Sequence, residues 1–290
     1  MSDFGIVMAS DAAYADHARA AVASMRRHNA EAPIEIVVCG AVPVLDDTAC
    51  RYGCTQRHVA LPGELAAAIA AEDVPVVWSR LAKFDCMLAS TFDPCLYLDA
   101  DVIALADVAD IVAEAPLDAR AAYMLLRRPA QPTLYRWRHA YLTHAQALAP
   151  QAVATLLNEA FGLRLTVDEM LAIRCWNAGV IYAARAALER LAGEWRALYL
   201  RMVTGPHRAR FAPKDQLCLW LAAERLKEEV EIRELPLAWN FMPGHTVPED
   251  ERRVWDAIAA LARMRGAARL LHFGHTKDEP WAVELREACP

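Results

Sequence analysis

The first hundred residues alternate between short β-rich runs and segments whose apolar residues recur with helical spacing. The β-rich runs lie at 4–10, 34–40, 56–61 and 95–99, and the helical segments at 11–29 and 79–90. Strands that alternate with helices are joined by right-handed crossovers and form a largely parallel sheet. This alternation predicts an α/β fold of the Rossmann-like kind, with helices on both faces of a mixed, mainly parallel sheet.

The second half of the chain is less regular, but it continues the same pattern. It predicts strands at 121–127, 177–184, 231–237 and 268–274, and helices at 185–203, 214–227 and near 249–265. Residues 133–174 are mostly helical in pattern and contain a basic and aromatic stretch at 134–141. No repeat or linker interrupts the sequence, so we expect one domain over 1–290, with a helical insertion at 120–175.

Composition excludes several classes of protein. At 290 residues and 56% hydrophobic content, the chain can bury a full core without a disulfide or a structural metal. A net charge of −6 with no long run of like charges argues against nucleic acid as the main partner. No apolar run is long enough for stable membrane insertion, and no export signal is evident. The eight cysteines are scattered without a C-x-x-C, which favours reduced thiols and a cytoplasmic location. Homo-oligomerisation stays open.

The run "CLYLDADVIAL" places two aspartates, Asp99 and Asp101, where a buried strand is expected to end. Ligands of open α/β sheets bind outside the carboxyl ends of the strands. Residues i and i+2 of an extended segment point to the same side, so both carboxylates can converge. Two bare carboxylates repel, whereas a divalent cation bound with substrate phosphates removes the conflict. The alternative is a strand that runs into a solvated turn, because so short a motif also arises by chance.

Seven segments of the sequence resemble segments of one known family. "YLDADVIALADV" (97–108) resembles the D-x-D segment of retaining glycosyltransferases of the GT-A fold, family eight, which includes glycogenin and bacterial lipopolysaccharide galactosyltransferases. Six further segments resemble family segments in the same order: "VMASDAAYADHARAAVASMRRHN" (7–29), "RLAKFDCM" (80–87), "WNAGVIY" (176–182), "KDQLCLW" (214–220), "LPLAWNF" (235–241) and "LLHFGHTK" (270–277). The resemblance covers most of the chain outside roughly 120–175.

The resemblance implies a retaining transferase that moves a hexose, glucose or galactose, from a UDP-sugar to an acceptor that the sequence does not identify. It implies a nucleotide-binding half at 1–119 and a sugar and acceptor half at 176–290. The metal, Mn²⁺ or Mg²⁺, would act as a Lewis acid at the leaving diphosphate, with Asp99, Asp101 and His272 as its ligands. The residues implied to bind the donor are Ala9, Asp11, Tyr14, Lys83, Asp99, Ala100, Asp101, Asn177, Gly179, His272 and Gly274.

The same resemblance implies three catalytic residues, Asp215, Gln216 and Lys277. A double displacement needs a nucleophile on the face opposite UDP, for which Asp215 or Gln216 is the nearest candidate, whereas a front-face route needs none. The closing motif departs from the family pattern His-x-x-Gly-x-x-Lys-Pro-Trp. In "HFGHTKDEPW" the glycine comes one residue early, and Asp278 and Glu279 separate the lysine from the proline.

Several of these residues also have ordinary structural interpretations. Asp11 and Asp215 suit helix N-termini, Lys83 suits a solvated helix face, and His272 suits a partly buried strand end. The competing functions are a nucleotide-sugar-binding protein without transferase activity and a phosphohydrolase of the haloacid-dehalogenase kind. The second expects its D-x-D near the N-terminus, with a further acidic cluster downstream. The basic and aromatic stretch within 120–175 fits an acceptor site or lid, a binding site for an anionic acceptor, or a solvated helix with some buried aromatic residues.

Overall fold

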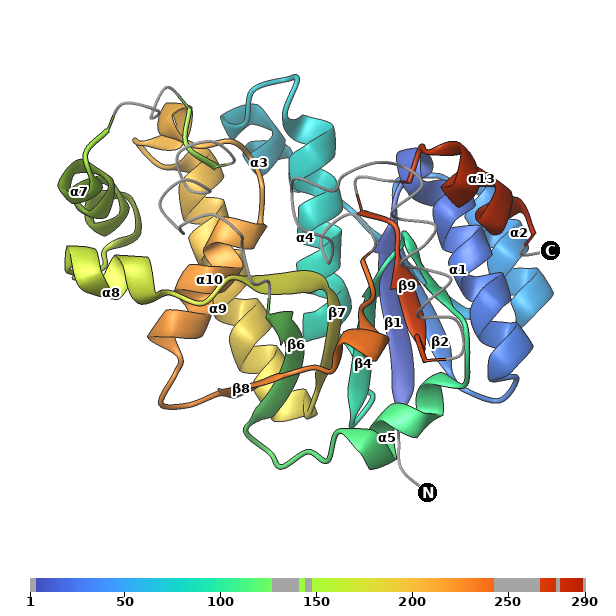
Figure 1. Ribbon diagram of the computed structural model, residues 1–290. Helices are drawn as coiled ribbons and strands as arrows, with labels where there is room; N and C mark the ends of the chain where they lie inside the picture. The colour runs from blue at the N-terminus through green and yellow to red at the C-terminus, as the bar shows by residue number, and fades with distance from the viewer. Residues whose placement is uncertain (1–3, 127–140, 144–147, 243–266, 275–276, 289–290) are drawn as a thin grey trace.

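A seven-stranded sheet forms the centre of the computed structural model, which describes residues 4–126, 141–143, 148–242, 267–274 and 277–288 (Figure 1). The strand order is β3-β2-β1-β4-β7-β6-β8. The strands are β1 (Gly5–Ser10), β2 (Ile34–Cys39), β3 (Thr55–Val59), β4 (Cys95–Asp99), β6 (Ala121–Leu126), β7 (Trp176–Ala183) and β8 (Glu231–Glu234).

Most strand pairs are parallel, as the sequence predicts. β1 pairs in parallel with β2 and β4, β2 with β3, and β6 with β8, while β7 runs antiparallel between β4 and β6. The central strands β1, β2 and β7 are buried along nearly their whole length. Such near-continuous apolar runs are typical of strands covered on both faces. The mixed, mainly parallel α/β sheet is therefore confirmed.

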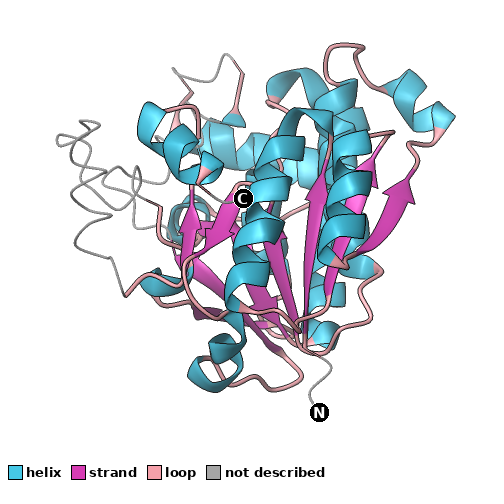
Figure 2. Cartoon of the chain, turned by 90° about the vertical axis from the view of Figure 1, so that its right-hand side faces the viewer, coloured by secondary structure: helices cyan, strands magenta, loops and turns pink. Residues whose placement is uncertain are grey.

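Helices cover both faces because successive strand side chains point to opposite sides. Ile6 and Met8 of β1 pack with α1 (Ala15–His28) and α2 (Pro43–Tyr52). Val7 faces the other side, in a core with α4 (Val74–Leu88), α9 (Arg185–Thr204) and α10 (Gln216–Arg225). Figure 2, in which the right-hand side of Figure 1 faces the viewer, shows helices standing in front of the strands. The remaining described α-helices are α3 (Gly63–Ala68), α5 (Ile111–Glu114), α7 (Pro150–Phe161), α8 (Val167–Ala172) and α13 (Pro280–Glu287).

The described residues also include four single-turn 3₁₀ helices. They are η1 (Ala12–Tyr14), η2 (Val108–Asp110), η4 (Arg208–Arg210) and η5 (Leu237–Trp239). Within the described residues, no helix combines the length and apolarity needed to cross a bilayer.

A second, two-stranded sheet brings distant parts of the sequence together. β5 (Val102–Ala104) pairs antiparallel with β9 (Leu270–His272), and Val102 lies opposite His272. The carbonyl of Asp101 accepts a hydrogen bond from the backbone amide of Phe273 at 3.0 Å. This short sheet therefore sets His272 beside the residues that follow β4.

The elements differ from the sequence expectation in a few places. α4 begins at Val74 rather than at 79, and the expected helix 11–29 begins as η1 before α1 takes over at Ala15. α2, α3, α5, α13 and β5 were not predicted. β5 is only three residues long and is defined as a strand by its pairing with β9. Local sequence pattern does not reveal such a long-range pairing. The helix expected near 249–265 and most of the stretch 134–141 lie outside the described residues.

Candidate functional site

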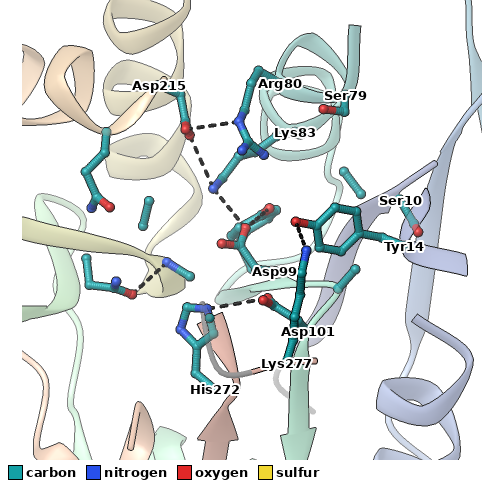
Figure 3. A pocket seen from close by; sticks show the side chains of 18 of the residues that line it. Ser10, Tyr14, Ser79, Arg80, Lys83, Asp99, Asp101, Asp215, His272 and Lys277 are labelled. Atoms are coloured by element: carbon teal, nitrogen blue, oxygen red, sulfur yellow. Dashed lines mark hydrogen bonds and ion pairs between the residues drawn. The ribbon is translucent and has the colours of Figure 1, made fainter. Parts of the chain in front are cut away.

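A pocket of about 470 Å³ opens at the carboxyl ends of β1 and β4, where a doubly wound sheet binds its ligands (Figure 3). All fourteen residues that the resemblance implies for the site line this pocket, although they come from segments spread over the whole chain. They are Ala9, Asp11, Tyr14, Lys83, Asp99, Ala100, Asp101, Asn177, Gly179, Asp215, Gln216, His272, Gly274 and Lys277. The structure thus brings these residues together; their roles in binding and catalysis stay predictions.

The two aspartates and the histidine converge on one point of this pocket. One ligand atom from each of Asp99, Asp101 and His272 lies within 4.8 Å of the others, and His272 Nε2 is 3.4 Å from Asp101 Oδ1. The ligands of an octahedral ion at about 2.1 Å are about 3–4 Å apart, so small side-chain rotations suffice. Two carboxylates and one imidazole suit a hard to borderline divalent cation. The residues present fit Mn²⁺ or Mg²⁺.

The reason for this convergence differs from the one expected. β4 ends at Asp99, and Asp101 lies in the turn before β5 rather than in an extended segment. Burial alone would raise the pKa of the Asp101 carboxyl, but the charge and hydrogen bond of His272 oppose burial and the pKa is lowered. Asp101 is therefore a carboxylate held by the β5–β9 sheet and its histidine, not an acid in a solvated turn.

Asp99 is fixed by a tyrosine and a lysine. The Tyr97 hydroxyl donates to Asp99 Oδ1 at 2.7 Å, and Lys83 Nζ lies 2.8 Å from the same oxygen. The second carboxylate oxygen is then the one that can bind an ion. The side chain of Lys83 is only 4% exposed and lies 5.2 Å from the ring centres of Tyr97 and Trp195. The interpretation of Lys83 as a solvated helix lysine is therefore wrong.

Asp215 is paired with cations instead of capping a helix. It precedes α10, but its side chain makes no capping hydrogen bond. Its Oδ1 lies 3.1 Å from Arg80 Nε, and its Oδ2 lies 3.4 Å from Lys83 Nζ. The Asp215 charge raises the pKa of the Arg80 guanidinium above its ordinary value, against the opposing effect of burial. Figure 3 shows Arg80, Lys83, Asp215 and Asp99 as one continuous ionic network beside the pocket.

Gln216 is oriented by a backbone carbonyl. Its side-chain Nε2 donates to the carbonyl oxygen of Trp176, which also accepts from Trp220 Nε1 at 2.8 Å. Since the amide nitrogen is used in this bond, the side-chain oxygen is the atom that suits a ligand's hydroxyl group.

His272 is attached to β7 through two buried asparagines. Its Nδ1 lies 3.1 Å from Asn240 Oδ1, and Asn240 Nδ2 donates to Asn177 Oδ1 at 2.8 Å. The same oxygen accepts from the backbone amide of Gly179 at 2.9 Å. The imidazole packs directly over Gly179, where a Cβ would lie 2.0 Å from His272 Cε1. A glycine at this position is thus required by the position of the ring.

Three further predicted residues, Asp11, Tyr14 and Lys277, also line the pocket. Asp11 Oδ1 caps η1 by accepting from Tyr14 N at 3.1 Å, so the structural interpretation of Asp11 holds, and its second oxygen is not used in the cap. Lys277 Nζ donates to the Tyr14 hydroxyl at 2.6 Å and lies 4.0 Å from the ring centre. The lysine therefore reaches the pocket despite the altered spacing of the closing motif.

Helix α13 supports this lysine from outside the pocket. Arg286 donates to the Lys277 carbonyl at 3.3 Å and contacts the ring nitrogen Nδ1 of His17 at 2.9 Å. Burial, and then the charge of Arg286, lower the pKa of His17 below its ordinary value. Gly274, two residues after the end of β9, adopts a φ of +54°, a conformation that favours glycine.

The sequence interpretation missed several residues of the pocket. Arg80 lies one helical turn before Lys83, a spacing that places both cations on one side of α4. Tyr97 precedes Asp99 by two residues on β4 and therefore shares its face. These two spacings were available signals. The other lining residues not predicted are Ser10, Ser79, Ala178 and Met242.

Comparisons with protein-family models and with curated protein sequences find no match. Among solved structures, the chain is similar to the galactosyltransferase LgtC in complex with donor and acceptor sugar analogs, with a TM-score of 0.59 and 15% identity over 98% of this chain and 95% of that one. It is also similar to the glycosyltransferase GlyE of Streptococcus pneumoniae TIGR4, with a TM-score of 0.53 and 17% identity over 98% of this chain and 59% of GlyE. At these identities the likeness establishes the fold: it is of the GT-A kind, and the structural neighbours are glycosyltransferases, as the motifs indicate.

Proposed function

We propose that this chain is a metal-dependent, retaining glycosyltransferase that takes a hexose, glucose or galactose, from a UDP-sugar. The observation that carries the proposal is the convergence of Asp99, Asp101 and His272 on one point of the pocket at the carboxyl ends of β1 and β4. Three further features support it: the GT-A fold, the position at the carboxyl ends of the strands, and cationic side chains around the metal ligands.

Donor binding would divide the pocket into two parts. Asp11 and Tyr14 would hold the uracil through the unused carboxylate oxygen and the aromatic ring. Asp99, Asp101 and His272 would hold Mn²⁺ or Mg²⁺, which supplies a Lewis acid for the leaving diphosphate when bound. Lys277 would bind the diphosphate oxygens from the closing segment. The metal ion and Lys277 would offset the negative charge that develops on the diphosphate as the anomeric bond breaks.

The sugar would lie between β7 and α10. Asn177 and Gln216 offer it hydrogen bonds, and Asp215 lies beside them. Both oxygens of Asp215 face cations, Arg80 and Lys83, and a carboxylate paired in this way is a weak nucleophile. The arrangement therefore supports the front-face route to retention, in which Asp215 keeps the two cations in place instead of attacking the sugar.

A thermal-shift screen tests the donor without knowledge of the acceptor. The protein is heated with a panel of nucleotide sugars, each with Mn²⁺ and with a chelator. We expect UDP-sugars to raise the melting temperature only when Mn²⁺ is present, because a bound ligand stabilises the native state. Absence of UDP binding in calorimetry, with metal and without, would rule the proposal out. A protein that binds a UDP-sugar yet releases no UDP with any acceptor would instead be the non-catalytic binder.

Lys277→Met is expected to weaken UDP binding about tenfold in the presence of Mn²⁺. A hydrogen bond to a charged group contributes about 1.5–3 kcal/mol, and methionine keeps the length of the side chain without the charge. Calorimetry of UDP with the two proteins measures the change. Lys227→Met is the matched control, because Lys227 is exposed and pairs with Glu224 away from the pocket. Equal affinities in Lys277→Met and the parent chain would remove Lys277 from the donor site.

We also propose that the protein acts in the cytoplasm. The seven cysteines that the structure describes are all free, which supports a reducing, cytoplasmic environment. A UDP-sugar and a separate acceptor are the expected partners.

A further inference from the structure

A chain of hydrogen bonds connects β7 to the histidine of the metal group. It runs from the Gly179 amide to Asn177 Oδ1, from Asn177 Oδ1 to Asn240 Nδ2, and from Asn240 Oδ1 to His272 Nδ1, at 2.9, 2.8 and 3.1 Å. All three side chains lie in buried residues, with Asn240 0% exposed. None of the sequence motifs assigned a role to Asn240.

The direction of each bond in this chain follows from one fixed donor. A backbone amide only donates, so the side-chain atom of Asn177 that faces Gly179 must be the oxygen. Asn240 must then present its NH₂ group to that oxygen and its own oxygen to His272. An amide oxygen only accepts, so His272 Nδ1 must carry a proton. Nε2, which lies 3.4 Å from Asp101 Oδ1, is then the ring atom that a divalent ion would bind in place of a proton.

We propose that Asn240 is a positioning residue: it holds the proton of His272 on Nδ1. The lone pair of Nε2 is thereby directed toward the position beside Asp99 and Asp101 where a metal ion would bind. This inference deepens the proposed function and rests on its metal group. Metal-ligating histidines commonly donate their second N–H to such a partner, and loss of that partner costs about 10–100-fold in metal affinity.

The same chain limits what Asn177 can offer a donor sugar. Its Oδ1 already accepts two hydrogen bonds, from Gly179 and Asn240. Its amide N–H groups are then the part that suits the pocket, so Asn177 would donate to a sugar oxygen while Gln216 accepts from a hydroxyl. The asparagine predicted for the sugar is in this way connected through Asn240 to the metal ligand.

The test uses Mn²⁺ binding measured by electron paramagnetic resonance, with and without UDP, and needs neither donor turnover nor an acceptor. Asn240→Leu removes both hydrogen bonds at similar volume and is expected to weaken Mn²⁺ binding about 10–100-fold. Asn240→Asp keeps an acceptor for His272 Nδ1 and, in its protonated form, a donor for Asn177 Oδ1, and it is expected to keep Mn²⁺ affinity within about threefold, well inside the loss typical of a missing outer-shell partner. Asn158→Leu is the control. The side-chain amide of Asn158 also makes two hydrogen bonds, one to the carbonyl and one to the backbone amide of Leu165, but Asn158 lies outside the pocket.

A second readout examines the proton itself. In ¹⁵N-histidine-labelled protein, the nuclear magnetic resonance spectrum of the parent chain is expected to show a proton on His272 Nδ1, assigned by its loss in His272→Gln. A ring without a proton on Nδ1 would overturn the inference, as would a folded Asn240→Leu that binds Mn²⁺ like the parent. Should Asn240→Leu fail to fold, the parent spectrum and Asn240→Asp decide, and an Asn240→Asp that loses Mn²⁺ binding tenfold contradicts it. Failure to release UDP in every assay would refute the transferase activity and leave both readouts unaffected.

Discussion

Asp101→Asn is expected to abolish the metal-dependent part of UDP binding, with a loss of more than about 100-fold in affinity. Asp101 is buried, and its carboxylate faces both His272 and the point where the ion would lie. Asparagine has the same shape but no charge, and its NH₂ group repels a cation. Changes in the outer shell of a metal site already cost about 10–100-fold, so loss of a direct ligand must cost more.

Calorimetry of UDP with and without Mn²⁺ measures this effect. The parent chain should bind UDP more tightly with Mn²⁺, and Asp101→Asn should bind it equally weakly in both conditions. Asp85→Asn makes the same chemical change at a half-exposed aspartate on α4, which pairs with Arg196 at 3.7 Å, and should behave like the parent. A circular dichroism spectrum must show that Asp101→Asn is folded. A folded Asp101→Asn that retains Mn²⁺-dependent affinity would remove Asp101 from the metal group.

Most of the sheet could be predicted because its strands are visible in the sequence as short apolar runs. β1, β2 and β4 are apolar runs bounded by helical segments, and such a pattern requires crossovers and parallel pairing. The antiparallel strand β7 was predicted as a strand, but its direction depends on the path of the chain through 127–175, which periodicity does not encode. The run at 268–274 predicts β9, whereas β5 depends on its pairing with β9 across about 170 residues and was not defined by its own three residues.

The order of the motifs was enough to predict which residues line the pocket. It did not predict which contacts these residues make with one another. The D-x-D pair, Asn177 and His272 each stand in a segment with a family counterpart, and the fold brings them to one edge of the sheet. The pairing of Asp215 with Arg80 and Lys83 was not predicted, because it joins α4 to the start of α10 in space. Asn240 was missed for the same reason: its importance lies in two partners from β7 and β9.

Gly179→Ala is expected to displace His272 from the candidate metal site, because the imidazole packs directly over this glycine. A Cβ there would lie 2.0 Å from His272 Cε1 and 2.5 Å from Nδ1, distances that real contacts do not reach. The ring cannot move away freely, because Asn240 holds Nδ1 and the residue is 4% exposed. We therefore expect His272 to be displaced from the position where it would bind a metal ion. Mn²⁺ affinity should be at least about tenfold lower, and the free energy of unfolding should be lower by about 1–3 kcal/mol.

Gly193→Ala separates this effect from a general response to a methyl group. Gly193 lies within α9, and its nearest neighbour to a new Cβ is Leu88 Cδ2 at 4.0 Å. A helical glycine replaced without strain should raise the free energy of unfolding by about 0.4–1 kcal/mol and leave Mn²⁺ binding unchanged. Urea unfolding and electron paramagnetic resonance of both variants measure the two quantities. If Gly179→Ala bound Mn²⁺ as tightly as Gly193→Ala, the imidazole over Gly179 would not be the ligand, and the metal group would have to be assigned without His272.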